Sequence, residues 1–138
     1  MAQGARTAAS RMITRVIDTS VIMAVVLVEP GYEVAARLAN GAAISSVNLA
    51  EVVAKCIDRQ VPPEVALSFM KDTNVEVVGF DDDLAIVAGE LQRKARKGVL
   101  SLGDRACIAT AMRLNATVVT ADRIWASLDI DCAVELIR

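Results

Sequence analysis

Short runs of β-branched residues alternate with helical stretches along this chain, and this alternation restricts the fold more than any other feature. Strand–helix alternation is typical of β-α-β units, in which parallel strands form one sheet with helices on both faces. The sequence therefore predicts an α/β fold in which helices cover both faces of a parallel sheet. The predicted strands are 16–17, 43–45, 75–80, 116–120 and 132–137.

Most of the predicted helices begin at a capping residue. Ser46 is predicted to cap a helix that runs to about Arg59, and Ser101 a helix that runs to about Leu114. Asp81 is predicted to cap a helix over 82–97, which Gly98 ends. Because no repeat or linker interrupts the pattern, residues 14–138 are predicted to form one domain. Shorter helical segments are predicted over 32–39, 62–70 and 123–127.

Residues 1–13 lie before the first predicted strand and contain basic residues but no acid. One interpretation is an organellar transit peptide. The other, which we adopt as the prediction, is a flexible leader before a second start at Met12. A membrane span is not expected, because the longest uncharged stretch, 38–50, is much shorter than the about 20 apolar residues that a span requires.

The chain contains no histidine. This excludes Ser-His-Asp and Cys-His mechanisms, and also zinc and iron sites with imidazole ligands. The three cysteines, Cys56, Cys107 and Cys132, are odd in number and form no Cys-x-x-Cys pair. They are expected to be reduced core residues of a cytoplasmic protein. Any acid–base or metal chemistry must therefore use carboxylates.

The formal net charge is −2, and the aromatic residues are one Trp, one Tyr and two Phe. This composition does not favour nucleic-acid binding by bulk charge or by a base-stacking platform. A phosphate polymer would have to be bound by local positive charge or through a metal ion.

Two acids lie at the carboxyl ends of predicted strands. Asp18 comes after Val16-Ile17, and Asp122 comes two residues after the strand that ends at Thr120. Each has a structural alternative as the N-cap of the helical segment that follows. The carboxyl ends of parallel strands meet at one edge of a sheet, where ligands gather, so both acids are expected there.

Two further acids lie on predicted helices. Asp104 shares a helix face with Ile108 and Ala111, although its spacing from Ser101 also fits a capping box. Glu51 flanks the apolar stripe of its helix and, taken alone, is typical of a solvated surface residue. Carboxylates that converge repel one another, and a divalent cation relieves the repulsion. Oxygen ligands without histidine favour Mg²⁺ or Mn²⁺.

The chain resembles the PIN-domain ribonucleases, and among them the VapC-type toxins of bacterial toxin–antitoxin pairs. The match runs from about residue 14 to the end, and its four motifs occur in the order that the family shows. They are Val16-Ile-Asp-Thr-Ser-Val21, Ser45-Ser-Val-Asn-Leu-Ala-Glu-Val52, Ser101-Leu-Gly-Asp-Arg-Ala-Cys107 and Val118-Val-Thr-Ala-Asp-Arg-Ile-Trp125.

The resemblance implies a three-layer α/β/α fold around a mainly parallel sheet. It also implies that an acidic quartet binds Mg²⁺ or Mn²⁺ and hydrolyses RNA phosphodiester bonds. Thr120, Asn48 and Ser20 are expected to support the quartet. A homodimer and a cognate antitoxin are implied as partners. The quartet residues are Asp18, Glu51, Asp104 and Asp122.

A basic cluster precedes the third acid of the quartet. Its members are candidate RNA contacts, but cations at a helix end also favour the helix dipole without any ligand. Arg105, which follows Asp104, is a further candidate contact. The cluster consists of Arg93, Lys94, Arg96 and Lys97.

Three other functions compete with the nuclease interpretation. An aspartyl phosphatase would use Asp18 as nucleophile but requires an acid where Ser20 stands. A phospho-acceptor domain would require an acid adjacent to Asp18. A PIN-like module that binds RNA or protein without catalysis is the third alternative.

Overall fold

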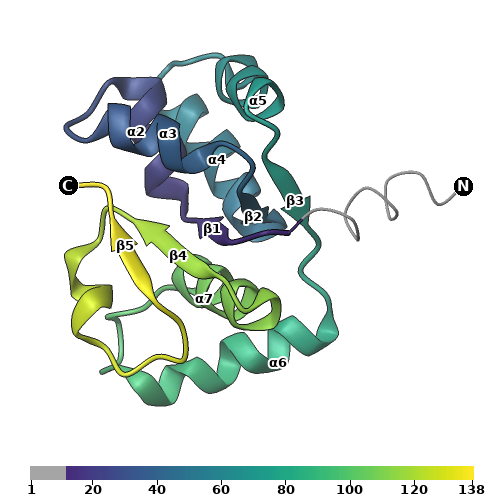
Figure 1. The fold of residues 1–138 in the computed structure, drawn as a ribbon, viewed down its shortest axis with the longest axis vertical. Helices are drawn as coiled ribbons and strands as arrows, with labels where there is room; N and C mark the ends of the chain where they lie inside the picture. Colours follow the sequence, from purple (N-terminus) through teal and green to yellow (C-terminus); the bar gives the residue numbers. More distant parts are fainter. Residues whose placement is uncertain (1–11) are drawn as a thin grey trace, which may run out of the picture.

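The computed structural model describes residues 12–138, and its strands form one five-stranded sheet. The strand order is β3-β2-β1-β4-β5, and every neighbouring pair is parallel (Figure 1). The predicted parallel sheet is therefore confirmed. The strands are β1 (Arg15–Ile17), β2 (Ala43–Ser45), β3 (Glu76–Val78), β4 (Thr117–Thr120) and β5 (Val134–Leu136).

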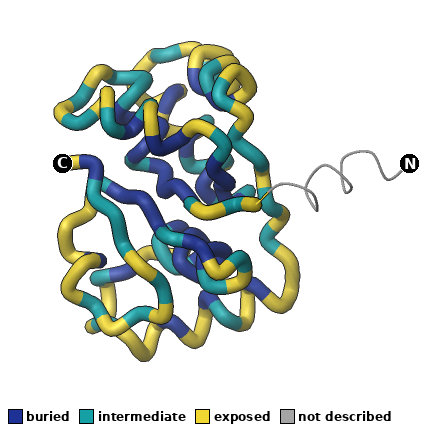
Figure 2. The backbone as a smooth tube through the Cα atoms, viewed as in Figure 1, coloured by how far each residue is buried: buried dark blue, intermediate teal, exposed yellow. Residues whose placement is uncertain are grey.

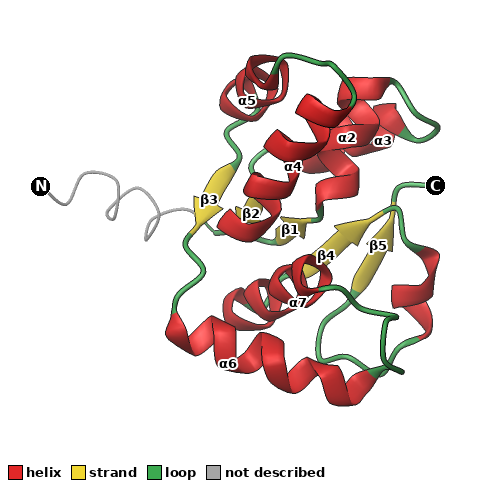
Figure 3. Ribbon diagram, turned by 180° about the vertical axis from the view of Figure 1, so that it is seen from behind, coloured by secondary structure: helices red, strands yellow, loops and turns green. Residues whose placement is uncertain are grey.

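Helices cover both faces of the sheet. Figures 1 and 3 show α2, α3, α4 and α5 on one side of the strands and α6 and α7 on the other, which confirms the three-layer α/β/α arrangement. None of the helices within residues 12–138 is long and apolar enough to cross a membrane. The α-helices are α2 (Thr19–Leu27), α3 (Tyr32–Ala39), α4 (Ser46–Asp58), α5 (Pro63–Asp72), α6 (Asp82–Glu90) and α7 (Leu102–Leu114), and the 3₁₀ helices are η1 (Leu91–Lys94) and η2 (Arg123–Ser127).

The three central strands divide the core into two apolar clusters. Successive side chains of a strand point to opposite faces of the sheet, so adjacent residues enter different clusters. In β1, Ile17 packs with α2, α3, α4 and α5, whereas Val16 packs with α6 and α7. In β4, Val119 and Val118 divide in the same way, and all four side chains are fully buried. Figure 2 shows that the buried stretches of the chain lie in the middle of the molecule and the exposed stretches around it.

Two predicted helix ends differ from the structure. Ser45, not Ser46, caps α4, because its Oγ accepts the Val47 N–H at 3.2 Å. The helix predicted over 82–97 ends at Glu90 and continues as the 3₁₀ helix η1. Gly89 lies two residues before η1 begins, and glycine has low helix propensity, which favours an end of the helix there. The basic cluster therefore lies on η1 and the loop after it.

The predicted leader falls almost entirely on residues 1–11, which lie outside the described residues.

The sheet topology places β1 between β2 and β4. The chain adds strands on one side of β1 as far as β3 and then crosses to the other side for β4 and β5. A ligand site is expected at the carboxyl ends of the strands where the direction of winding changes. This point lies between β1, which Asp18 follows, and β4, which Asp122 follows closely.

Candidate active site

Asp18 lies directly after β1 at the start of α2 and is only 6% exposed. It does not use its side chain to cap α2. Instead, its Oδ2 accepts hydrogen bonds from Ser20 Oγ at 2.8 Å and Thr120 Oγ1 at 3.0 Å. Burial raises the pKa of Asp18 to about 6, although the Ser20 hydroxyl bond opposes this rise. The negative charge of Asp104 raises the pKa further.

Thr120 connects Asp18 to Asp122. The buried Thr120 hydroxyl donates to Asp18 and accepts the backbone N–H of Asp122 at 3.0 Å. Asp122 itself is exposed, and its Oδ1 accepts the Ile124 N–H at 3.1 Å at the start of η2. The structural alternative for Asp122, a helix cap, is therefore present in the same place as the expected site.

Glu51 is not a solvated surface residue. It is partly buried, and its Oε1 accepts hydrogen bonds from Thr19 Oγ1 at 2.6 Å and Asn48 Nδ2 at 3.0 Å. Asn48 is fully buried and also donates to the Gly103 carbonyl oxygen at 3.1 Å. These bonds connect α2, α4 and the first turn of α7. The sequence analysis did not single out Thr19, although its place directly after Asp18 was a usable signal.

Gly103 leaves room for the Glu51 carboxylate. A Cβ atom added to this glycine would collide with the carboxylate of Glu51. Gly103 is buried in the first turn of α7, one residue before Asp104. A side chain at this position is therefore incompatible with the observed position of Glu51.

Asp104 combines a structural role with a place among the acids. It completes a capping box with Ser101, because its Oδ2 accepts the Ser101 N–H at 2.9 Å and its own N–H donates to Ser101 Oγ at 3.2 Å. Partial burial raises the pKa of Asp104, and the negative charges of Asp122 and Glu51 add to this rise. Asp104 thus lies close enough to the other three acids to raise the pKa of Asp18 and to have its own pKa raised by Asp122 and Glu51.

Oxygen donors surround these acids, and the chemistry of the set fits Mg²⁺ or Mn²⁺. Asn48 Oδ1 is also buried at the same place and has no hydrogen-bond partner within residues 12–138. As they stand, however, no three acidic or cysteine side chains within residues 12–138 converge closely enough to hold an ion.

The candidate RNA contacts of the basic cluster take part in ion pairs or lie in a loop. Arg93 Nε pairs with Glu90 at 2.7 Å, and Lys94 Nζ lies 3.9 Å from Asp129. Arg96 and Lys97 are exposed in the loop before α7. A contact between this cluster and RNA stays a prediction.

Arg105 points into the protein. Its guanidinium donates to the carbonyl oxygens of Leu100 and Ala88 and so joins α7 to α6. We expect Arg105→Ala to lower the free energy of unfolding by about 1–3 kcal/mol, because two carbonyls lose a charged donor. Urea denaturation measures this loss. RNA affinity should remain within twofold of the wild-type value, and a large loss of affinity in a stably folded variant would instead indicate a direct contact.

A model of the PIN domain family matches residues 15–131. The chain belongs to the PIN domain family. The resemblance of its sequence motifs to PIN domains is thereby confirmed. No curated protein is significantly similar in sequence to this PIN domain.

Several solved structures share the fold of this PIN domain. VapBC2 from Rickettsia felis, bound to a DNA fragment from its promoter, has a TM-score of 0.69 at 20% identity and covers 90% of this chain and 98% of its own. A toxin–antitoxin complex from Klebsiella pneumoniae has a TM-score of 0.71 at 16% sequence identity, and the match covers 91% of this chain and 98% of the other. DNA-bound VapBC from Salmonella typhimurium has a TM-score of 0.66 at 22% sequence identity, and the match covers 92% of this chain and 100% of the other.

Proposed function

We propose that this PIN domain is a Mg²⁺- or Mn²⁺-dependent endoribonuclease and the toxin of a toxin–antitoxin pair. The observation that carries the proposal is the environment of Asp18. This carboxylate is almost completely buried at the edge of the sheet, its pKa is raised to about 6, and other acids lie near it. Perturbed carboxylates gathered at such an edge are typical of functional sites.

In this proposal, Asp18, Asp104 and Asp122 hold the metal ion, and Glu51 completes its surroundings. A bound divalent ion neutralises phosphate charge and lowers the pKa of water. The hydroxyls of Ser20 and Thr120 fix Oδ2 of Asp18.

Glu51 is proposed to orient the attacking water. Thr19 and Asn48 fix its Oε1, which leaves Oε2 without a hydrogen bond from either residue. Attack at phosphorus would leave a 5′-phosphate and a 3′-hydroxyl.

The toxin assignment rests on fold similarity to toxin–antitoxin complexes. The partner proposed for this chain is therefore a cognate antitoxin protein, and a homodimer and a cytoplasmic location are proposed with it. An aspartyl phosphatase is less favoured, because Ser20 occupies the position of the second acid and its hydroxyl donates to Asp18.

A catalytically silent PIN-like module is the second candidate function. It is favoured by the hydrogen bonds to backbone N–H groups that Asp104 makes in the capping box of α7 and that Asp122 makes as the N-cap of η2. In this case the protein would bind RNA with equal affinity in the presence and absence of a divalent ion and would never cleave it.

Cleavage of RNA tests the proposal directly. Purified protein, freed of any antitoxin, is incubated with total bacterial RNA in Mg²⁺, Mn²⁺ or EDTA. We expect discrete cleavage products with 5′-phosphate ends in either metal ion and none in EDTA. Cleavage that persists in EDTA would contradict metal dependence. If no RNA is cleaved and calorimetry detects no binding of Mn²⁺, the nuclease proposal is wrong.

A further inference from the structure

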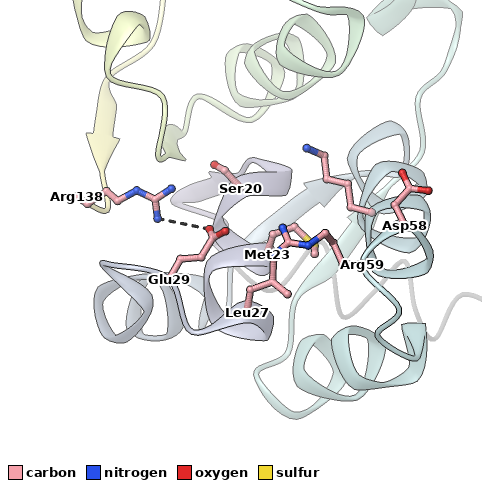
Figure 4. A pocket seen from close by; sticks show the side chains of 8 residues that line it. Ser20, Met23, Leu27, Glu29, Asp58, Arg59 and Arg138 are labelled. Atoms are coloured by element: carbon pink, nitrogen blue, oxygen red, sulfur yellow. Dashed lines mark ion pairs between the residues drawn. The ribbon is translucent and has the colours of Figure 1, made fainter.

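A pocket of about 360 Å³ adjoins the acidic site, and the proposed mechanism does not use it. Ser20 belongs to both places, because it lines the pocket and donates a hydrogen bond to Asp18. Figure 4 shows Met23 and Leu27 in the middle of the pocket. The volume is at the lower end of the range for ligand sites, which suits one group of mononucleotide size.

Two cations of the pocket follow Glu51 along the chain, Lys55 on α4 and Arg59 as the residue that caps its C-terminal end. Lys55 and Arg59 follow Glu51 at intervals of four residues, so the three side chains lie on one side of the helix. Each interval advances about 6 Å along the helix axis. The positive charges therefore begin one helical turn away from the acid that is proposed to orient water.

These cations are available to a ligand. Lys55 and Arg59 are exposed, and neither forms an ion pair with another residue of the 12–138 segment. Arg138, on the opposite wall, lies 3.7 Å from Glu29, and this pair is drawn in Figure 4. Asp58 remains as the one other acid of the pocket lining. The lining thus has three cations and two acids, whereas the chain as a whole is acidic.

The apolar part of the pocket suits the flat face of a base. Met23 and Leu27 are one helical turn apart on α2 and lie between the two charged walls (Figure 4). Met23 is only 5% exposed, so Leu27 supplies most of the apolar surface that a base would contact. Cationic edges around an apolar centre match the phosphate and the base of a nucleotide.

We propose that this pocket binds one nucleotide of single-stranded RNA that flanks the scissile phosphate. Lys55 and Arg59 contact its phosphate, and Met23 and Leu27 contact its base. The proposal rests on the nuclease function above and deepens it, because it names the part of the substrate that this chain holds beside the cleavage site.

The test measures binding in a protein that does not cleave. In an Asp18→Asn background with Mg²⁺, the affinity of a fluorescein-labelled single-stranded RNA oligonucleotide is measured by anisotropy over a range of salt concentrations. We expect Lys55→Ala/Arg59→Ala to weaken binding about tenfold at low salt. The slope of log K against log salt should fall in magnitude by about 0.7, because the two cations contact one phosphate and each neutralised phosphate of a single strand contributes about 0.7.

One further variant separates the contribution of the base contact to affinity from that of the phosphate contact, and a second variant is a control. Leu27→Ser should weaken binding about threefold and leave the salt slope unchanged, because it removes an apolar contact only. Lys71→Ala is the matched control, since this exposed helical lysine does not line the pocket, and its affinity and slope should equal those of the parent.

The outcomes separate this proposal from the nuclease function. If Lys55→Ala/Arg59→Ala binds RNA with the affinity and slope of the parent, the nucleotide pocket is wrong, even if the wild-type protein cleaves RNA. If the double variant loses affinity and salt slope while the wild-type protein cleaves no RNA and binds no Mn²⁺, the pocket binds a nucleotide of RNA but the nuclease function is wrong, and with it the place of this nucleotide beside a scissile phosphate.

Discussion

Asp18→Asn is expected to abolish RNA cleavage while the protein stays folded. A carboxylate that holds a catalytic metal ion contributes several kcal/mol to the transition state. Its loss should therefore lower the cleavage rate by on the order of 1,000-fold, since about 1.4 kcal/mol corresponds to a factor of ten. The amide oxygen of Asn can still accept the hydroxyls of Ser20 and Thr120, so the local geometry is retained. Gel-based cleavage of total RNA measures the loss, and full activity of the variant would contradict the proposed site.

The same variant should be more stable than the wild-type protein when metal is removed. Burial raises the pKa of Asp18 from 3.8 to about 6, so the folded state binds more protons than the unfolded state between these values. Stability of the wild-type protein in EDTA should accordingly fall as pH rises from about 4 to 6 and then level off, with a total loss of up to about 3 kcal/mol from this group. Asp18→Asn should lack this loss.

Thermal unfolding in EDTA at several pH values checks this expectation. At pH 7.5 the melting temperature of Asp18→Asn should exceed that of the wild-type protein by a few degrees. Added Mg²⁺ should raise the melting temperature of the wild-type protein only, because ligands stabilise the state that binds them. Identical pH profiles for the two proteins would contradict a buried, ionised Asp18.

Gly103→Ala is expected to cause the second large loss of activity. The new methyl group would collide with the Glu51 carboxylate, which must then move away from Thr19 and Asn48. We expect cleavage to fall about 100-fold, by analogy with the 10- to 100-fold effect of changing groups that orient metal ligands. Stability should fall by about 1–3 kcal/mol, because Asn48 is buried and loses a charged partner. Cleavage assays and urea denaturation measure the two effects.

Gly89→Ala provides the matched control, because it introduces the same methyl group on α6 into open space. Alanine has the higher helix propensity, so this variant should gain up to about 1 kcal/mol of stability and retain its activity. If Gly103→Ala behaves like Gly89→Ala, Glu51 does not need its observed position.

The layers and the place of the site could be predicted from sequence because they depend on local patterns. The runs at Val16-Ile17 and Val118-Val119 showed buried strands, and the acid that follows each run marked the edge of the sheet. The end of α6 could not be predicted, because the change to a 3₁₀ helix at Leu91 leaves the apolar pattern unaltered. The bond between Asn48 and Glu51 fits their local spacing on one helix, whereas the bond between Thr19 and Glu51 does not follow from any local pattern. Thr19 lies 32 residues away from Glu51, and only the packing of α2 against α4 brings the two side chains together.

The pairing of β1 with β4 has a consequence for protein synthesis. Thr120 is separated from Asp18 by 102 residues and yet holds its carboxylate. A nascent chain that extends only to Leu114 already carries Asp18, Glu51 and Asp104, but not the strand that would complete the edge of the sheet. Such long-range parallel pairing forms late and slowly in folding. A truncated translation product should therefore be inert, and the activity proposed for this chain would arise only after almost all of it has left the ribosome.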